Sequence, residues 1–227
     1  MIIKGIQKLT LLDFPGRVAC TVFTAGCNFR CPFCHNASLV LGGSDGFINE
    51  NEIFAFLEAR RGRLSGICIS GGEPTLQPDL ARFIRRVKEL GYAVKLDTNG
   101  YRPEVLRELL SEGLLDYVAM DIKSSRERYS AVAGVEVDVS KIEESAALLM
   151  SSGVPYEFRT TVVRELHSAE DFPEIGNWLS GAEKFYLQSF VDSGDVISDG
   201  LNGYDKKDLQ ELLNLLKVKI PSAKIRG

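Results

Sequence analysis

Strand-like and helical segments alternate regularly along this chain, and this alternation constrains the fold more than any other feature of the sequence. Apolar strand-like runs fall at Val18–Thr24, Ile67–Ser70, Ala93–Asp97, Tyr117–Asp121, Tyr156–Val163 and Lys184–Gln188. Apolar residues recur at the i, i+3, i+4 spacing of amphipathic helices in Glu52–Arg61, Pro78–Leu90, Pro103–Ser111, Lys141–Ser152, Ala169–Leu179 and Leu209–Val218. Because parallel neighbours need a crossover, usually a right-handed helix, these units predict an α/β fold with a parallel sheet.

The length of the chain limits how this sheet can close. With 227 residues the chain is too short for the eight units and roughly 250 residues of a closed barrel. We therefore expect one domain over residues 1–227, a TIM-like partial (βα)6 barrel of parallel strands. Residues 1–17 are expected to form an N-terminal extended hairpin or flap packed on the barrel. A doubly wound sheet is the alternative that periodicity leaves open.

The charge and hydropathy of the chain exclude two broad classes of function. The 27 Lys and Arg against 31 Asp and Glu give a formal net charge of -4, which disfavours a protein that neutralises nucleic-acid phosphates. The apolar runs are far shorter than the roughly 20 residues that a membrane-spanning helix needs. The first residues, Met1–Gly5, lack the features of a secretory signal, so we expect a cytoplasmic protein without nucleic-acid or membrane partners.

The five cysteines divide into a cluster of three and two isolated residues. Cys27, Cys31 and Cys34 lie within eight residues, which indicates metal or redox chemistry rather than disulfides in a cytoplasmic protein. Cys20 and Cys68 each lie inside an apolar strand-like run, where a free cysteine usually behaves as a small buried hydrophobic residue. We therefore assign the first three as candidate metal ligands and the other two to the core.

Polar and soft-ligand residues are concentrated where the predicted strands end. In parallel α/β folds, functional groups gather at the carboxyl ends of the strands. The segments at these ends are Ala25–Asn36, Ser70–Pro74, Asp97–Gly100 and Asp121–Lys123, together with Arg159, Arg164, His167 and Gln188 on or after the last two strands. We expect these segments to converge on one rim and to form the functional site.

The C-x3-C-x2-C spacing is compatible with several kinds of site. Thiolates are soft ligands that favour zinc or an iron–sulfur cluster. A closed structural zinc site needs four ligands, and no second cysteine pair follows this one. Cys31–Cys34 alone resembles a thioredoxin-like redox pair, and with His35 it matches c-type haem attachment, but both interpretations leave Cys27 without a role. A cubane cluster held by three cysteines uses all three thiols and keeps one iron open, and we favour it.

These motifs resemble those of the radical S-adenosylmethionine (SAM) superfamily. The resemblance rests on Cys27-x3-Cys31-x-Phe33-Cys34 and on Gly71-Gly72-Glu73-Pro74, which follows one βα unit later. Across nearly the whole chain the sequence is also similar to the activating enzymes of glycyl radical enzymes, through the segments Asp13–Gly16, Gly26–Cys31, Cys34–Asn36, Leu96–Gly100 and Asp121–Lys123. Within that group it most resembles the longer form of the anaerobic ribonucleoside-triphosphate reductase activating protein.

The resemblance implies a cofactor set and a mechanism. Cys27, Cys31 and Cys34 would bind three irons of a single [4Fe-4S] cluster, and SAM would chelate the fourth. In this superfamily the reduced cluster splits SAM into methionine and a 5′-deoxyadenosyl radical, which here would take the α-hydrogen of a glycine in the partner enzyme. The cluster and SAM thus carry the radical chemistry, and no side chain is expected to act as a catalytic residue.

The resemblance also assigns residues to the cofactor. Phe33 and the backbone beside His35 would meet the adenine, and Gly71 and Gly72 would let the backbone approach the methionine moiety. Glu73 either joins this contact or holds the turn. The further candidates are Lys123 and Arg159 for the SAM carboxylate, Asp97, Thr98 and Asp121 for the ribose or a monovalent cation, and Asn99 and Gln188 beside them.

Simpler structural roles remain open for several of these residues. Asp97 and Asn99 precede a glycine and a predicted helix, where capping or an Asx turn explains them equally well. Lys123 has the alternative role of a solvated loop lysine. His167 is expected at the surface, and Trp178 is expected in the core.

The sequence thus predicts a radical SAM activase that generates a glycyl radical on anaerobic ribonucleoside-triphosphate reductase and receives electrons from a flavodoxin or ferredoxin. One alternative is an activator of the pyruvate formate-lyase type, although this chain has Val163-Arg164 where such activators have Pro-Gly, and Val191 where they have a histidine. Another is a small-molecule radical SAM enzyme such as 7-carboxy-7-deazaguanine synthase. The last is a zinc-binding interaction module without enzymatic activity.

Overall fold

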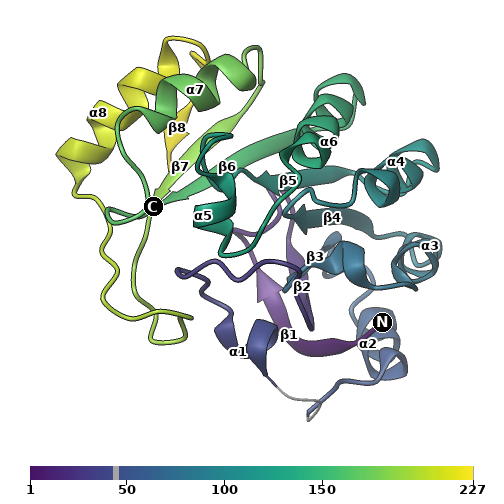
Figure 1. Cartoon of the computed structure of the whole chain (residues 1–227). Coiled ribbons are helices and arrows are strands. Elements are labelled where there is room, and N and C mark those ends of the chain that lie inside the picture. The colour runs from purple at the N-terminus through teal and green to yellow at the C-terminus, as the bar shows by residue number, and fades with distance from the viewer. Residues whose placement is uncertain (43–45, 227) are drawn as a thin grey trace.

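A single mixed sheet forms the centre of the molecule. The computed structural model describes residues 1–42 and 46–226, and within them eight strands lie side by side in chain order. The strands are β1 (Ile3–Thr10), β2 (Ala19–Thr24), β3 (Gly66–Gly71), β4 (Ala93–Thr98), β5 (Tyr117–Asp121), β6 (Tyr156–Val162), β7 (Phe185–Ser189) and β8 (Lys224–Ile225). The pair β1–β2 is antiparallel and every later pair is parallel, as Figure 1 shows.

Helices connect the parallel strands, with the longer ones on the outer side of the sheet (Figure 1). They are α1 (Ala37–Leu41), α2 (Glu50–Ala59), the 3-10 helix η1 (Pro74–Leu76), α3 (Leu80–Glu89), α4 (Pro103–Ser111), α5 (Tyr129–Ala133), α6 (Val139–Ser151), α7 (Asp171–Trp178) and α8 (Lys206–Lys217). A doubly wound sheet would reverse its strand order at a switch point, whereas here the order follows the chain from β1 to β8. The partial barrel with an N-terminal hairpin is therefore confirmed.

Local sequence signals set several of the helix ends. Asn49 and Glu52 form a capping box at the start of α2, in which each side chain bonds to the backbone of the other residue. Pro103 occupies the first turn of α4, where its missing N–H has no cost. Gly134 ends α5 with a φ of 70°, a left-handed conformation that glycine adopts without strain.

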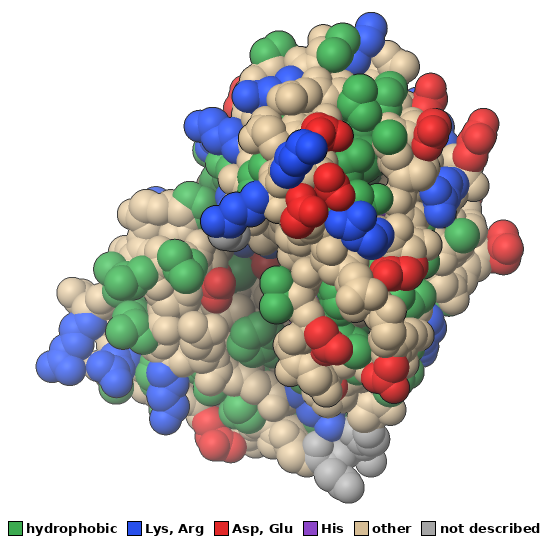
Figure 2. Space-filling model, turned by 90° about the vertical axis from the view of Figure 1, so that its left-hand side faces the viewer, with side chains coloured by type: hydrophobic (Ala, Val, Ile, Leu, Met, Phe, Trp, Pro, Cys, Tyr) green, Lys and Arg blue, Asp and Glu red, His purple; other side chains and the backbone are tan. Residues whose placement is uncertain are grey.

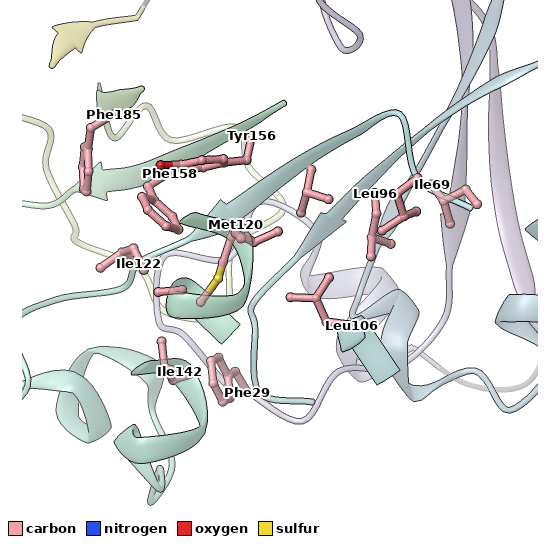
Figure 3. Packing of buried hydrophobic residues seen from close by; sticks show 14 of the residues in the cluster. Phe29, Ile69, Leu96, Leu106, Met120, Ile122, Ile142, Tyr156, Phe158 and Phe185 are labelled. Atoms are coloured by element: carbon pink, nitrogen blue, oxygen red, sulfur yellow. The ribbon is translucent and has the colours of Figure 1, made fainter. Parts of the chain in front are cut away.

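The hydrophobic core lies between the sheet and the helices that cover its outer face. Alternate strand residues such as Val94 and Leu96 on β4 are fully buried there. Figure 3 shows Leu96 near Ile69 of β3 and Leu106 of α4. Burial of each such side chain contributes about 1.5–3 kcal/mol. The intervening strand residues point to the inside of the barrel, and many of them are polar or charged.

The loop between β1 and β2 closes the amino-terminal end of the barrel. Phe14 is buried against Ala19, Ala93 and Tyr117 at the starts of β2, β4 and β5. Its ring lies 6.2 Å from that of Tyr117, and it fills the space beside Gly66 that a Cβ would enter. The barrel is therefore blocked at this end, and its cavity opens at the carboxyl ends of the strands.

The surface carries mixed charge. Acidic and basic side chains are interspersed over most of the face shown in Figure 2, in keeping with the formal net charge of -4. Over the described residues, no helix has the combination of length and apolar character required to cross a membrane.

Half-buried Arg226 forms an ion pair with the buried carboxylate of Glu157 on β6. Arg226 donates to both carboxylate oxygens of Glu157, at 2.6 and 2.8 Å, and Tyr117 donates to the same carboxylate at 2.8 Å. Glu157 is only 1% exposed, so Arg226→Ala leaves its carboxylate with the Tyr117 hydroxyl but without its ion-pair partner and should reduce the free energy of unfolding by about 1–3 kcal/mol. Urea denaturation measures this loss.

Two comparisons test that prediction. Burial opposes ionisation of Glu157, but Arg226 outweighs it and holds the pKa of the carboxyl below its ordinary value. The stabilisation is therefore complete above the ordinary glutamate pKa and is lost as the pH falls through the lowered pKa. The double variant Glu157→Gln/Arg226→Met should recover part of the stability, because it leaves no unpaired charge. A double variant no more stable than Arg226→Ala would contradict this explanation.

Candidate functional site

One cavity at the carboxyl ends of the strands collects most of the predicted site residues. Its volume is about 440 Å³, within the range of small-molecule sites. Arg164 and His167 are not among its lining residues, whereas every residue assigned above to the cluster or SAM is: Cys27, Cys31, Phe33, Cys34, His35, Gly71, Gly72, Glu73, Asp97, Thr98, Asn99, Asp121, Lys123, Arg159 and Gln188. Sequence reasoning had not assigned a cofactor role to Asp13, Ser70 and Thr161, which also line it.

The three clustered cysteines lie on the loop that follows β2. Burial raises the pKa of Cys27 to about 12 and also raises the pKa of Cys31, so both are thiols until a metal displaces the proton. The backbone N–H of Cys34 donates to the carbonyl of Cys31 at 3.0 Å and so forms a turn between these two ligands. The loop therefore presents all three sulfurs to one cavity.

The other two cysteines are both buried, as predicted, but in different surroundings. Cys20 belongs to the hydrophobic core outside the sheet. Cys68 faces the inside of the barrel, where the Lys95 ammonium lies 3.7 Å from its sulfur. The expectation of an apolar environment is thus confirmed for Cys20 alone.

Packing from distant segments fixes the cysteine loop. Phe29 contacts the rings of Tyr101 and Tyr129 at centroid distances of 5.7 and 6.4 Å. The backbone N–H of Arg30 donates to the carbonyl of Ala133 at 2.9 Å. The segment after β7 adds a hydrogen bond of 2.9 Å from Ser198 N–H to the carbonyl of Pro32. These contacts hold the loop from several sides.

Gly71 and Gly72 bring two backbone segments into direct contact. Gly71 has a φ of 116°, and a Cβ there would lie 2.3 Å from the backbone nitrogen of Thr24. A Cβ on Gly72 would lie 1.9 Å from the carbonyl oxygen of Gly26. The backbone N–H of Gly72 donates to Thr24 and that of Glu73 to Gly26, at 2.9 and 2.8 Å. Only glycine permits this contact between the end of β3 and the start of the cysteine loop.

The buried carboxylate of Glu73 connects two segments of the site by hydrogen bonds. Burial raises the pKa of its carboxyl, which is 1% exposed. Its oxygens accept hydrogen bonds from the backbone and hydroxyl of Thr75, the hydroxyl of Thr98 and the backbone of Asn99. Of the two roles open to Glu73, these bonds favour holding the turn, and they link it to the end of β4.

A charged network occupies the inner wall of the cavity. Asp97 pairs with Lys95 and, at 3.4 Å, with Arg159. Asp121 pairs with Arg159 at 2.8 Å and with Lys123 at 3.1 Å. Burial opposes ionisation of Asp121, but Arg159 and Lys123 outweigh it and lower its pKa to about 2. Side-chain cations balance both carboxylates, so the network gives no support to the predicted monovalent cation site.

The remaining candidates occupy the rim. Phe33 is buried at the cavity wall with the Lys123 ammonium 5.9 Å from its ring centroid, so Lys123 is not a solvated loop lysine. His35 is exposed and stacks on Phe190 with centroids 5.2 Å apart. Asn99 accepts a hydrogen bond of 3.0 Å from the backbone of Tyr101, which is the Asx turn that the sequence allows.

Three further residues, His167, Trp178 and Arg164, lie outside the cavity. His167, predicted at the surface, is 3% exposed, and its Nε2 lies 2.8 Å from the carbonyl oxygen of Lys123. Its Nδ1 accepts from the backbone N–H of Val163 at 3.1 Å, so the ring holds the loop that carries Lys123. Trp178 is partly buried at the edge of the core, against Tyr129. Arg164 is exposed and pairs with Asp208 at 3.0 Å.

The chemistry of the three cysteines fits a cluster better than a single metal ion. In the described parts of the chain, no group of three or more His, Cys, Asp or Glu side chains is arranged to hold one ion. The three thiols line one cavity and have no fourth protein ligand beside them, which suits a cubane with an open iron. Among the described residues, the Nδ2 of Asn28, the residue that follows Cys27, is buried without a hydrogen-bond partner, as a donor awaiting a bound group would be.

Comparisons with known proteins point to one superfamily. The family model described as the radical SAM superfamily matches residues 21–179. A protein of Methanocaldococcus jannaschii assigned as a glycyl-radical enzyme activating enzyme is 34% identical over 99% of this chain and 95% of its own length. A Saccharolobus solfataricus protein assigned as a GTP 3′,8-cyclase is 30% identical over 62% of this chain and 46% of its own length.

Solved structures share the fold at low sequence identity. The Streptococcus suis protein SuiB, bound to its precursor peptide SuiA, matches with a TM-score of 0.73 and 16% identity over 91% of this chain and 48% of that one. A domain of a pyruvate-formate lyase-activating enzyme from Bacteroides vulgatus matches with a TM-score of 0.59 and 19% identity over 72% of this chain and 99% of that domain.

Proposed function

The chain belongs to the radical SAM superfamily, and on that basis we propose that it is an activating enzyme which generates a glycyl radical on anaerobic ribonucleoside-triphosphate reductase. The observation that carries the activase part of the proposal is the 34% identity, over 99% of this chain, to a protein assigned as a glycyl-radical enzyme activating enzyme. The choice of the reductase rests on the sequence resemblance to its activating protein. A flavodoxin or ferredoxin is the proposed electron donor.

The family implies a [4Fe-4S] cluster and SAM, and the cavity offers residues for both. We assign Cys27, Cys31 and Cys34 as ligands of three irons. When bound, the cluster and SAM supply a one-electron reduction that converts SAM into a species able to abstract hydrogen from carbon. The protein side chains then have to bind SAM, orient it and exclude water.

The proposed contacts to SAM follow from the two sides of the cavity. Gly71 and Gly72 line the cavity, so their backbone is available to the methionine moiety. On the opposite side, Lys123 and Arg159 carry positive charges held in place by Asp121, and each has N–H groups left to pair with a carboxylate. Phe33 offers an apolar ring face to the adenine.

The open end of the cavity suits a protein substrate. The barrel is blocked at its amino-terminal end by Phe14, so a substrate reaches the site only from the carboxyl ends of the strands. A loop of the partner enzyme seated there would place its glycine over the cavity and exclude water during the reaction. The reaction would then be confined to the complex of the two proteins.

Electron paramagnetic resonance tests the proposed function. The reconstituted, reduced protein is incubated with SAM and with purified anaerobic ribonucleoside-triphosphate reductase or pyruvate formate-lyase. We expect a persistent protein-centred radical that needs the reductase, with consumption of about one SAM per radical formed. The signal should be absent from a reductase whose target glycine is replaced by alanine.

The same experiment separates the alternatives. A radical formed only on pyruvate formate-lyase would keep the activase assignment and refute the choice of partner. Repeated turnover of a free metabolite without any partner protein would instead identify a small-molecule enzyme, such as a 7-carboxy-7-deazaguanine synthase. Protein that binds zinc but neither iron nor sulfide would refute the enzymatic assignment altogether.

A further inference from the structure

The carboxamide of Asn28 is a buried polar group that the fold does not satisfy. Among the described residues, its Nδ2 is the one buried side-chain nitrogen or oxygen atom without a hydrogen-bond partner. Leaving such a donor unpaired costs about 1–3 kcal/mol. Native proteins seldom retain an unpaired buried donor without a bound group to receive it, so the position of this nitrogen next to a candidate cluster ligand needs an explanation.

The orientation of the Asn28 carboxamide is fixed by its neighbours. The Oδ1 of Asn99 accepts from the backbone N–H of Tyr101 at 3.0 Å, so the Nδ2 of Asn99 must point the other way. That nitrogen donates to the Oδ1 of Asn28 at 2.8 Å. A flipped Asn28 carboxamide would place two N–H donors against each other, so its Nδ2 stays on the unpaired side.

This orientation is anchored in the Gly-Gly-Glu motif. The backbone N–H of Asn99 donates to Glu73, whose carboxylate also binds Thr98 and Thr75. A continuous set of hydrogen bonds therefore runs from the end of β3 through the end of β4 to Asn28 in the cysteine loop. Rotation of the Asn28 side chain to satisfy its free N–H groups elsewhere would break that set.

The sulfur of Cys27 lies among polar groups of three residues. It accepts from the backbone N–H of Phe29 at 3.3 Å and from the Nδ2 of Asn99 at 3.9 Å, and its thiol donates to the Oδ1 of Asn28 at 3.9 Å. Two N–H groups, those of Phe29 and Asn99, therefore already point to the sulfur at this corner of the site.

We propose that Asn28 tunes the reduction potential of the cluster, by donating a hydrogen bond from its Nδ2 to a sulfur of the bound [4Fe-4S] cluster at the Cys27 corner. Reduction adds negative charge to the cluster sulfurs, so an N–H donor stabilises the reduced form more than the oxidised form. Asn28 therefore makes the cluster easier to reduce. The inference rests on the cluster-binding part of the proposed function and does not depend on which partner enzyme is activated.

The test compares midpoint potentials of reconstituted variants. Asn28→Leu removes the donor and keeps the approximate shape, and Asn28→Asp keeps the oxygen that accepts from Asn99 while removing the donor. We expect both variants to have more negative potentials in EPR-monitored titrations without SAM. A tenfold shift of the reduction equilibrium, about 59 mV for one electron, is the expected size for Asn28→Leu. The control Asn51→Leu, an exposed position on α2, should leave the potential unchanged.

Each outcome decides the inference. Variants with full iron and sulfide content and the native potential would overturn it. If neither variant holds a cluster, the structure of the anaerobic native protein decides, because the Nδ2 of Asn28 must then lie within hydrogen-bonding distance of a cluster sulfur. A native protein that binds no cluster would overturn the proposed function as well, whereas an unchanged potential overturns this inference alone.

Discussion

Replacement of Cys31 by alanine is expected to abolish cluster assembly and SAM cleavage. The thiol is 6% exposed and lies in the same cavity as those of Cys27 and Cys34, so no other cysteine in the described chain can take its place. Two remaining thiols would leave two irons of a cubane without protein ligands. Substitutions that disturb only the surroundings of a metal ligand typically reduce affinity by 10–100-fold, so loss of a ligand should exceed about 100-fold.

Iron and sulfide analysis of anaerobically reconstituted protein measures this effect, with SAM cleavage as the second readout. Cys20→Ala is the matched control, because Cys20 lies in the hydrophobic core and burial raises the pKa of its thiol to about 12. The control should lose stability, by about 1–2 kcal/mol, and retain iron, sulfide and SAM cleavage. Equal loss of iron from both variants would show that our separation of ligand and core cysteines is wrong.

The long elements of the fold were predictable from the sequence because each has a clear hydrophobic period. The strand Tyr117–Asp121 and the helix Pro103–Ser111 were predicted with the bounds that the structure has. The short elements α1, α5 and β8 were not predicted, because a hydrophobic repeat cannot be recognised in five residues or fewer. Tertiary contacts define them instead, as when Tyr129 of α5 packs in the core.

The candidate site was predictable where the chemistry depends on residue type and spacing. The cysteine trio and the Gly-Gly-Glu motif converge on the cavity as expected. The positions that were wrong depend on contacts between distant segments. His167 was predicted at the surface because its neighbours in sequence are polar, yet the carbonyl of Lys123 and the backbone of Val163, which flank it in space, supply its hydrogen bonds.

Strand alternation could have given two of the missing residues. Lys95, Asp97 and Arg159 point into the barrel, so Ser70 and Thr161, which face the same side of neighbouring or identical strands, must do so as well. Asp13 does not belong to a strand, so strand alternation could not have identified it. It reaches the cavity from the loop between β1 and β2, where the Thr21 hydroxyl donates to it. Only the folded chain reveals that position.

The second large effect is expected from Gly71→Ala, which should weaken SAM binding by at least about tenfold and lower the thermal stability. A Cβ at this position would lie 2.3 and 2.5 Å from the backbone nitrogen and oxygen of Thr24, and backbone atoms cannot yield as a flexible side chain can. The end of β2 must then move, and with it Cys27, three residues further along the chain. Calorimetric titration of the reconstituted variant with SAM measures the affinity.

Gly91→Ala separates the steric clash from the strain of the backbone conformation. Gly71 and Gly91 both have a positive φ, 116° and 87°, so alanine at either position incurs a conformational penalty of about 1–2 kcal/mol. A Cβ at Gly91 meets nothing within 4 Å, so that variant should lose stability but bind SAM with native affinity. The difference in SAM affinity between the two variants then measures the close contact of β3 with the cysteine loop. Native affinity in Gly71→Ala would mean that this contact does not shape the SAM site.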